Sequence, residues 1–345
     1  MTIDLTDYRK FEQRKQDHIK LALLDANQAT AYNQLEQISL IHEALPDLNF
    51  DEIDISSCRF GQIISNPFFV SLMTASHHDA AMINYNLIAA CNDSGWAMGV
   101  GSQRRELTDK KAKFAWHKLL KQFPKVKLFS NLGIAQIIST PITQVQQLIA
   151  TLEAEALIIH CNSLQEVIQP EGTPQFKGCL QAISKLVAAL PIPIIIKETG
   201  CGFALPTLQR LNEIGIKAVD ISGLGGTHWG RIEGQRAHIG SIKQITAATF
   251  HNWGIDTVSS VKNALSLRPN YEVWGSGGVR HGLDAAKLLA LGVNSVGFAK
   301  PMLAAALVDA EQVYKTMKTI EYELMVAMFC TGSGNINKLK ACICP

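Results

Sequence analysis

Polar side chains crowd one short stretch of the sequence, directly after an apolar run. Residues 160–166 read His-Cys-Asn-Ser-Leu-Gln-Glu, and Gln-Pro-Glu-Gly follows at 169–172. The carboxylate of Glu166 suits a hard divalent cation, because such cations prefer oxygen ligands. The neighbouring amides of Asn162 and Gln165 could orient a substrate beside that cation. A lone histidine would be interpreted as structural, but this density of polar groups favours a site.

A second group of candidates lies near the N-terminus. Arg14, Lys15 and His18 could share one side of a helix or turn and bind a diphosphate. The alternative is an ordinary solvated charged face. The chain carries 32 Lys and Arg against 30 Asp and Glu, a net charge of +2, so the overall charge indicates neither a nucleic-acid partner nor an acidic membrane surface. Any anion must therefore be bound locally.

Two turns of small residues favour a phosphate site. One reads Gly-Ser-Gly-Gly-Val-Arg at 275–280 and the other Ala-Lys-Pro at 299–301, each after an apolar run. Such turns bring backbone N–H groups against an anion. Lys197 ends a further apolar run, where it could pair with an electron-rich cofactor atom or form an ordinary salt bridge.

Hydrogen-bonding side chains follow most of the other apolar runs. Each signal is weak alone, because strand ends are often polar. Together with the phosphate turns they predict a ring of polar groups around a phosphorylated planar cofactor, as flavin mononucleotide (FMN) would require. The members of this ring are Thr74, Ser102, Asn131, Ser222 and Thr227.

Two further features allow competing interpretations. The sequence His-His-Asp at 77–79 resembles a metal cluster, but adjacent histidines need not face one centre, and the aspartate could begin a helix. In the long loop before residue 240, Trp229 could wall an apolar pocket and Glu233 could support proton transfer. Arg231 and Arg236 make structural ion pairing an open alternative there.

The elements that position these residues are short apolar runs that alternate with helical segments. Continuous apolar runs are typical of parallel strands covered on both faces by helices. Eight runs favour a closed (β/α)8 TIM barrel over an open doubly wound sheet, and a barrel places its chemistry on the loops after its strands. One predicted helix covers 282–291 and ends at Gly292. The runs are 67–72, 97–100, 126–130, 157–160, 192–196, 218–221, 272–274 and 295–298.

Composition limits the remaining possibilities. The chain has 345 residues, 47% of them hydrophobic and 18% charged, which is typical of a globular protein with a large core. We predict one barrel domain over 1–345, with an N-terminal extension at 1–60 that contributes to the site and a C-terminal helical extension at 316–345. The charged start and the eight scattered cysteines, without paired zinc spacing, indicate a cytoplasmic protein with reduced thiols. Cys342 and Cys344 lie in a short tail of undetermined role.

The ordered motifs resemble those of the type 2 isopentenyl-diphosphate isomerases. The resemblance covers about 14–303 and is carried by RKQDHI, MTAS, VGSQR, SNLG, HCNSLQE with QPEGT, KETGCGF, DISGLGGTHWGRIEGQR and GSGGVRHGLDAAKLLALG. It implies an FMN-dependent, magnesium-requiring barrel that interconverts isopentenyl and dimethylallyl diphosphates and forms a homo-oligomer, commonly a tetramer or larger. Reduced FMN would serve as acid and base without net oxidation, and NADPH is the expected reductant.

The resemblance also implies a role for each candidate residue. Glu166 would bind magnesium, Gln165 would lie beside the reacting alkene and Trp229 beside the isoprenoid tail. Gln165 and Glu233 would assist the reduced flavin or orient the substrate. Substrate binding would involve Arg14, Lys15, His18, Ser102, Gln103, Arg104, His160, Asn162, Gln165 and Trp229. FMN would contact Met73, Thr74, Ala75, Ser102, Asn131, Lys197, Ser222 and Thr227, with its phosphate at Gly277, Gly278, Ala299 and Lys300.

Two departures from the family pattern leave alternatives open. The first turn reads MTAS where the family usually has MTGG, and Thr173 replaces the acidic residue expected after PEG. The side chains of Ala75 and Ser76 could crowd a flavin, because glycine allows closer approach. A catalytically impaired flavin-binding barrel is therefore one alternative. The other is an FMN-dependent 2-hydroxy-acid oxidase, which would use a histidine and an arginine such as His228 and Arg231.

Overall fold

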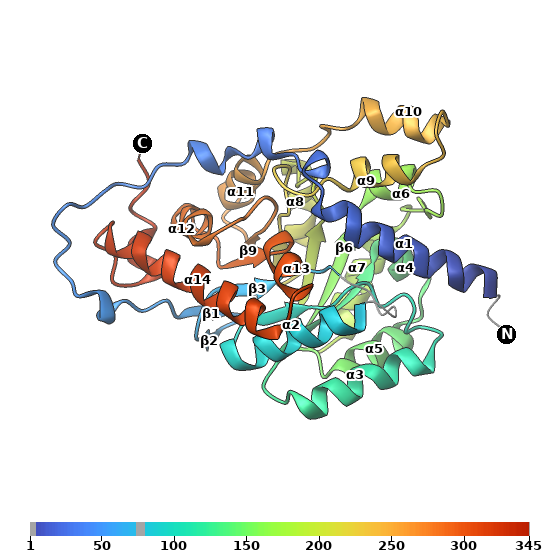
Figure 1. Ribbon diagram of the computed structural model, residues 1–345, viewed down its shortest axis with the longest axis horizontal. Coiled ribbons are helices and arrows are strands. Elements are labelled where there is room, and N and C mark those ends of the chain that lie inside the picture. Colours follow the sequence, from blue (N-terminus) through green and yellow to red (C-terminus); the bar gives the residue numbers. More distant parts are fainter. Residues whose placement is uncertain (1–4, 74–79, 345) are drawn as a thin grey trace.

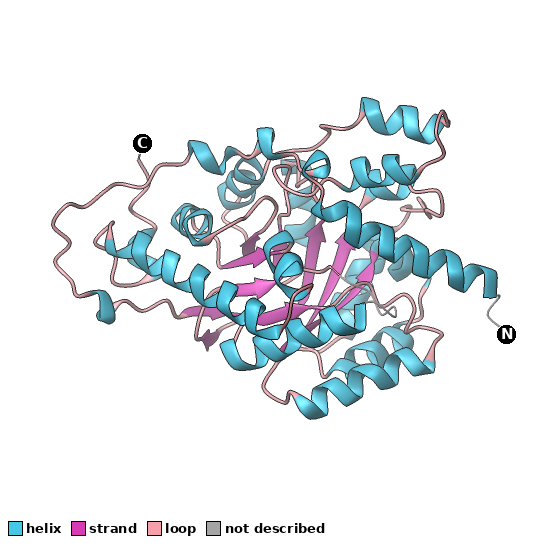
Figure 2. Ribbon diagram, viewed as in Figure 1, coloured by secondary structure: helices cyan, strands magenta, loops and turns pink. Residues whose placement is uncertain are grey.

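The computed structural model describes residues 5–73 and 80–344. Within these residues, eight parallel strands close into a barrel at the centre of the molecule (Figure 2). Strand β10 pairs with β3, which completes the circle and confirms the predicted barrel rather than an open sheet. In chain order the strands are β3 (Phe68–Val70), β4 (Ala97–Gly99), β5 (Lys127–Gly133), β6 (Ala156–Cys161), β7 (Ile194–Glu198), β8 (Ala218–Asp220), β9 (Glu272–Gly275) and β10 (Ser295–Phe298).

Side chains fill the inside of the barrel. The rings of Phe69, Phe129 and Trp274 meet there, with centroids 5.0, 5.5 and 6.4 Å apart. Below them a hairpin of β1 (Ser57–Arg59) and β2 (Gln62–Ile64) closes the amino end, where the Arg59 guanidinium lies 5.4 Å from the centroid of Trp274. The hairpin therefore covers the amino end of the barrel interior.

Helices alternate with the strands and cover the outside of the barrel (Figure 1). Helix α12 occupies the range predicted for it and ends at Gly292, whose φ of 112° suits glycine. Within the described residues no helix is both long and apolar enough to span a membrane. The covering helices are α2 (Ala80–Ser94), α3 (Lys110–Gln122), α5 (Ile142–Leu152), α7 (Cys179–Ala189), α8 (Leu205–Glu213), α11 (Thr257–Ser266), α12 (Gly282–Leu291) and α14 (Ala310–Phe329).

Shorter helices lie at the carboxyl ends of the strands, where they can position a site. The long interval between β8 and β9 is an insertion that contains α9 and α10 in addition to the covering helix α11. These shorter helices are α4 (Ile134–Ser139), α6 (Ser163–Ile168), α9 (Trp229–Arg236), α10 (Ile242–Thr249) and α13 (Lys300–Ala306).

The N-terminal extension crosses the carboxyl end of the barrel. Helix α1 (Leu5–Leu23) lies against α9 and α13 (Figure 1). Behind it, Gln28 bridges to Thr227, and the backbone N–H of Ala29 donates to the carbonyl of Gly226 at 2.7 Å. The extension is thereby bonded to the loop after β8. Its short 3-10 turns are η1 (Asp25–Asn27), η2 (Thr30–Tyr32), η3 (Gln34–Gln37) and η4 (Phe50–Glu52).

The C-terminal segment bonds residues 39–41 of the same N-terminal extension. After α15 (Ile336–Leu339), the carbonyl of Cys342 accepts from the N–H of Ile41 at 2.7 Å, and the N–H of Cys344 donates to the carbonyl of Ser39 at 2.9 Å. The tail whose role the sequence left undetermined thus pairs with residues 39–41.

Candidate active site

A cavity of about 580 Å³ opens at the carboxyl ends of the strands. Its walls combine the loops of the barrel with residues of the N-terminal extension. Among the predicted residues, those that line it are Arg14, Lys15, His18, Met73, Ser102, Arg104, Asn131, His160, Asn162, Gln165, Glu166, Lys197, Ser222, Thr227, Trp229, Gly277, Gly278, Ala299 and Lys300. Thr74 and Ala75, Ser76 and the His-His-Asp sequence at 77–79 lie outside the described residues.

A buried carboxylate, Glu233, bonds two residues that line the cavity. One is His18, on helix α1 of the N-terminal extension (hereafter the arm), and the other is Gln165, on α6 after strand β6. Its Oε1 accepts from Nε2 of His18 at 2.8 Å and from Nε2 of Gln165 at 2.9 Å, and its Oε2 accepts from Arg236 at 2.6 Å. Burial alone would raise the pKa of Glu233, but the hydrogen bonds from His18 and Gln165 and the charge of Arg236 lower it to about 2. Glu233 is therefore an anion at neutral pH.

The partners of Glu233 bring three segments together. Arg236, whose side chain is 7% exposed, also bonds Glu171 at 3.0 Å and Asp17 of α1 at 3.4 Å. Gln169, with its amide oriented to satisfy both neighbours, donates to Glu233 at 3.1 Å and accepts from Arg14 at 3.2 Å. The ion pair of Arg236 with Glu233 is the structural pairing that the sequence left open, whereas Gln169 was assigned no role from the sequence.

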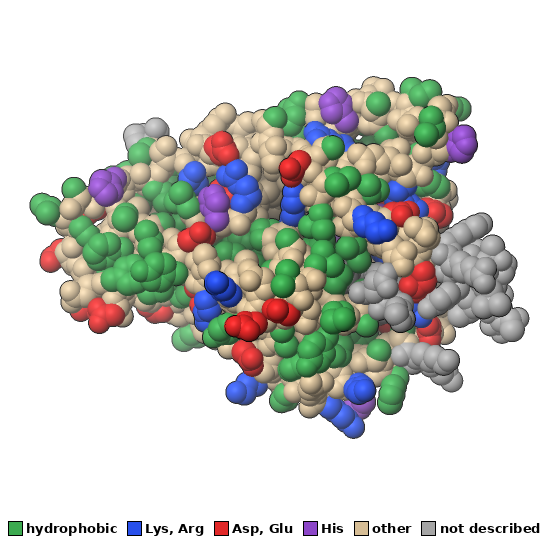
Figure 3. All heavy atoms as spheres, viewed as in Figure 1, with side chains coloured by type: hydrophobic (Ala, Val, Ile, Leu, Met, Phe, Trp, Pro, Cys, Tyr) green, Lys and Arg blue, Asp and Glu red, His purple; other side chains and the backbone are tan. Residues whose placement is uncertain are grey.

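The arm contributes cationic and imidazole groups to the cavity. Burial and the neighbouring charge of Arg14 lower the pKa of Lys15 to about 7. Burial lowers the pKa of His18 to about 4, so its neutral ring donates to Glu233 and packs edge-on against Trp229, with centroids 5.1 Å apart. Elsewhere on the face shown in Figure 3, basic and acidic side chains are interspersed. Arg14 and Lys15 both line the cavity, so the N-terminal extension places positive charge where an anion could bind.

Glu166 is held in a defined position on α6. Its Oε1 accepts from the Asn162 amide at 3.1 Å, and its Oε2 accepts from the backbone N–H of Thr173 at 2.6 Å and from the Thr173 hydroxyl at 3.3 Å. The threonine that departs from the family pattern thus bonds the predicted metal ligand. Among the described residues no three His, Cys, Asp or Glu side chains form a metal cage. A cation at Glu166 would need oxygens of substrate and water, a pattern typical of magnesium.

The barrel centre offers a second set of bonded polar groups. Lys197 is buried and donates to Asp220 at 2.5 Å and to the Ser276 hydroxyl at 3.0 Å. His160 bonds the side-chain oxygen of Asn131 at 2.8 Å, and burial followed by nearby lysine charge lowers its pKa to about 3. The ordinary salt bridge considered for Lys197 is therefore present, yet Lys197 still lines the cavity.

The loop after β9 is shaped to leave backbone donors available. Gly277 and Gly278 have φ values of 94° and 76°, and a Cβ at Gly278 would lie 2.6 Å from the carbonyl oxygen of Gly225. Within the described parts of the chain, the N–H groups of residues 277–279 donate to no protein acceptor. Available N–H groups in a glycine turn fit a phosphate. Nearby, Lys300 is paired with Asp25 of η1 at 3.0 Å.

Gln103 is the one described residue of the predicted substrate set that does not line the cavity. It is fully buried, and its Oε1 accepts from the Ser130 hydroxyl at 2.5 Å and from the Asn131 N–H at 3.1 Å. The expectation that it contacts substrate is corrected to a supporting position under the end of β5. Its side chain is bonded to the neighbouring strand instead of the cavity.

The histidine and arginine considered for an oxidase face away from the cavity. The fully buried His228 bonds the Trp253 carbonyl through Nε2 at 3.0 Å, and its Nδ1 accepts from the N–H of Arg231 at 3.2 Å. The Arg231 guanidinium bonds carbonyls of Gln28 and His251 at 2.8 and 2.7 Å. The Arg231 side chain therefore joins the N-terminal extension to the insertion, and the His228 side chain bonds within the insertion.

Comparisons with known proteins agree with this geometry. The model of the FMN-dependent dehydrogenase family matches residues 125–344. Among solved structures, a flavocytochrome b2 mutant superimposes with a TM-score of 0.69 at 17% identity, covering 99% of this chain and 86% of that one. A mandelate oxidase mutant gives 0.65 at 14% identity, covering 97% and 98%. At such identities the likeness shows the fold alone.

Relatives of much higher identity define the family. An isopentenyl-diphosphate delta-isomerase from Legionella pneumophila is 62% identical over 339 residues, 98% of this chain and 99% of that protein. One from Bdellovibrio bacteriovorus is 50% identical over 336 residues, 96% and 97%. One from Halobacterium salinarum is 38% identical, over 97% and 93%. The chain therefore belongs to the isopentenyl-diphosphate delta-isomerase family, in the FMN-dependent type 2 branch that its sequence motifs resemble.

Proposed function

We propose that this protein interconverts isopentenyl diphosphate and dimethylallyl diphosphate, with FMN and magnesium bound in the cavity. The observation that carries the proposal is the arrangement of two anion-binding regions around one cavity. The turn at 277–279 offers backbone N–H groups, and the N-terminal extension offers Arg14 and Lys15 in the cavity that Glu166 also lines. A phosphorylated cofactor and a diphosphate substrate could therefore bind together.

The substrate diphosphate would bind between the arm and Glu166. Arg14 and Lys15 would neutralise its charge, with Ser102 and Arg104 at the cavity wall. Glu166 would hold magnesium, which would neutralise negative charge on the diphosphate, because this cation typically combines one or two carboxylates with phosphate and water. Binding would also raise the pKa of Lys15 again, since a nearby anion favours the charged ammonium.

The reacting end of the substrate would lie between the barrel centre and Gln165. Reduced FMN, when bound there, supplies the group that gives and takes the proton at the alkene. Gln165 is held by Glu233 at 2.9 Å, which directs its amide, and Trp229 lines the same cavity beside His18. The Glu233 anion would stabilise the positive charge that develops on the tertiary carbon when the alkene is protonated. Its pKa of about 2 makes it unsuitable as the proton donor.

The flavin would be held by residues of six strand ends. Lys197 would face its electron-rich edge, with Met73, Asn131, Ser222 and Thr227 around the ring, and Gly277, Gly278, Ala299 and Lys300 near the phosphate. We further propose NADPH as the reductant, a homo-oligomeric state, and a cytoplasmic location. Reduced cysteines, all eight free in the structure, are consistent with that compartment.

One experiment tests the proposal. The purified protein with FMN is reduced anaerobically and incubated with isopentenyl diphosphate and magnesium in deuterated water. We expect dimethylallyl diphosphate to form with deuterium incorporated, without net oxidation of the flavin. Absence of both product and deuterium would refute the isomerase. Flavin reduction by a 2-hydroxy acid, tested in parallel, would support the oxidase that the orientation of His228 argues against.

A further inference from the structure

Two residues outside the cavity bond the backbone of the phosphate turn. The hydroxyl of Thr257 donates to the carbonyl of Gly277 at 2.8 Å and lies 3.3 Å from that of Ser276. The side-chain amide of Asn33 donates to the carbonyl of Gly278 at 2.8 Å. Thr257 is 2% exposed and Asn33 is 7% exposed, and neither is among the residues that line the cavity.

These bonds determine the direction of the backbone donors. In a trans peptide the C=O and N–H groups point in opposite directions, and no described peptide is cis. The carbonyl of Gly277 shares its peptide with the N–H of Gly278, and the carbonyl of Gly278 shares its peptide with the N–H of Val279. A side chain that anchors each carbonyl on one side therefore fixes the adjoining N–H on the other. Gly277, Gly278 and Val279 all line the cavity.

The glycines of the turn let it pack closely against the backbone at 223–226. They also leave its peptide planes free to rotate. Gly278 can adopt many backbone conformations that other residues cannot, so its two peptide planes need an external restraint. From below, the backbone at 223–226 limits the space: a Cβ at Gly277 would lie 2.5 Å from the carbonyl oxygen of Gly223. That contact excludes side chains, whereas the directional bonds to the two carbonyls come, within the described part of the chain, from Thr257 and Asn33.

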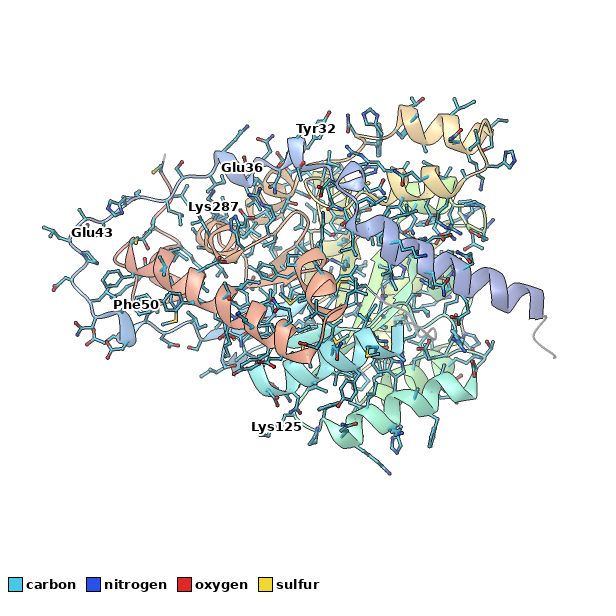
Figure 4. All side chains as sticks on the ribbon, in the orientation of Figure 1. Tyr32, Glu36, Glu43, Phe50, Lys125 and Lys287 are labelled. Atoms are coloured by element: carbon cyan, nitrogen blue, oxygen red, sulfur yellow. The ribbon has the colours of Figure 1, made fainter. Side chains whose placement is uncertain are left out.

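Both anchors are themselves firmly placed. Thr257 is the first residue of α11, whose N-cap Asp256 accepts from the N–H of Ser259. The side-chain oxygen of Asn33 accepts from the N–H of Leu35 at 3.1 Å. Next to it, Lys287 of α12 donates to the carbonyl of Leu35 at 2.9 Å, in the region labelled by Glu36 and Lys287 in Figure 4. The N-terminal extension is thus joined to the phosphate turn as well as to the substrate side.

We propose that Thr257 and Asn33 are positioning residues that aim the backbone N–H groups of the 277–279 turn at the phosphate of the flavin. The inference rests on the flavin site proposed above and extends it to residues that do not touch the ligand. It predicts a selective effect: loss of either anchor weakens binding of the phosphate and leaves binding of the ring unchanged. It also gives the N-terminal extension a part in cofactor binding.

The test compares two flavins that differ only in the phosphate. Apoprotein is titrated with FMN and with riboflavin, and the dissociation constants are obtained from the quenching of flavin fluorescence. For Thr257→Val, which keeps the shape and removes the hydroxyl, and for Asn33→Ala, we expect FMN affinity to fall about tenfold or more, the range for partners that orient a ligating group. Riboflavin affinity should change less than about twofold. Thr257→Ser should restore FMN affinity.

Controls separate positioning from loss of folding. Asn49→Ala removes the cap of another 3-10 turn of the extension, η4, and should leave both affinities unchanged. Equal loss of FMN and riboflavin affinity in the anchor variants would overturn the inference, and so would unchanged FMN affinity. If the wild-type protein bound FMN no better than riboflavin, the phosphate site itself would be refuted. If the wild-type protein preferred FMN and both variants kept that preference, the positioning role of Thr257 and Asn33 would be refuted, but the phosphate site would not.

Discussion

The ion pair between Arg236 and Glu233 makes a quantitative prediction about stability. Glu233 is fully buried, and its pKa of about 2 lies well below the ordinary 4.5. At about 1.36 kcal/mol per pKa unit, this difference corresponds to about 3 kcal/mol of stabilisation, which the hydrogen bonds from His18 and Gln165 share with the charge of Arg236. Because the folded-state pKa is the lower one, the stabilisation is complete above pH 4.5 and is lost as the pH falls towards 2. Neutral pH therefore gives the full effect.

We expect Arg236→Met to lower the free energy of unfolding by about 3 kcal/mol at pH 7, since it leaves a buried carboxylate without its cation. Because the hydrogen bonds from His18 and Gln165 remain, the variant carboxylate should titrate between the wild-type pKa and its ordinary pKa, and the difference in stability from wild type should shrink as the pH falls to 3. Glu171, which also bonds Arg236 and whose pKa is lowered in the fold, should contribute in the same direction. Urea unfolding from pH 7 to pH 3, with FMN saturating, measures these differences.

The matched control is Arg210→Met on α8, an exposed arginine that bonds only within its own helix. It should change the free energy of unfolding by no more than about 0.5 kcal/mol at any pH. Arg236→Lys keeps a positive charge and should fall between wild type and Arg236→Met. A deficit in Arg236→Met that is the same at pH 7 and pH 3 would refute the reasoning, because a loss of packing alone does not depend on the ionisation of Glu233.

Three further predictions concern the substrate side. Glu166→Gln should raise the magnesium concentration for half-maximal turnover about tenfold or more while the flavin absorption spectrum stays unchanged; loss of flavin would contradict the assignment. Gly172→Ala should reproduce that magnesium effect and lower the melting temperature, because a Cβ there would lie 1.9 Å from the Glu166 carbonyl oxygen. The pKa of Lys15 is lowered to about 7, so its ammonium loses its charge between pH 6 and pH 9, and the KM for the diphosphate substrate of the wild type should rise over that range. Lys15→Met should show a high KM that no longer varies with pH.

The barrel could be predicted because the sequence pattern of each strand and helix lies within one contiguous segment and recurs along the chain. Each strand is a continuous apolar run, and each run is followed by a segment long enough for a covering helix. The helix over 282–291 shows the same point, since its apolar residues and Gly292 specify both face and end. Closure of the sheet followed from the number of runs rather than from any one of them.

The site could be predicted only as a set of loops. The rule that chemistry lies after the strands located Lys197, Glu166 and the glycine turn correctly at the cavity. It did not reveal the direction of each side chain. Gln103 shows the failure: its position in a strand-end loop was right, but its amide bonds the end of β5 rather than the cavity.

Partners distant in sequence were beyond any local pattern. Arg236 is three residues from Glu233, yet its other partners, Asp17 and Glu171, come from α1 and from the loop after α6. Asp220 was not expected as the partner of Lys197, because the two residues belong to different strands. No spacing in the sequence brings such groups to within 4 Å.

The sequence by itself determined the barrel, the edge at which its chemistry lies and the kinds of groups gathered there, because periodic apolar runs and strand-end loops are properties of contiguous segments. Only the tertiary structure decided which of those groups face the cavity, which carboxylate is held as an anion, and which side chains aim the phosphate turn. Those outcomes depend on burial and on hydrogen bonds between distant segments, such as that from Asn33 to Gly278, and such contacts exist only after the extension has folded over the barrel.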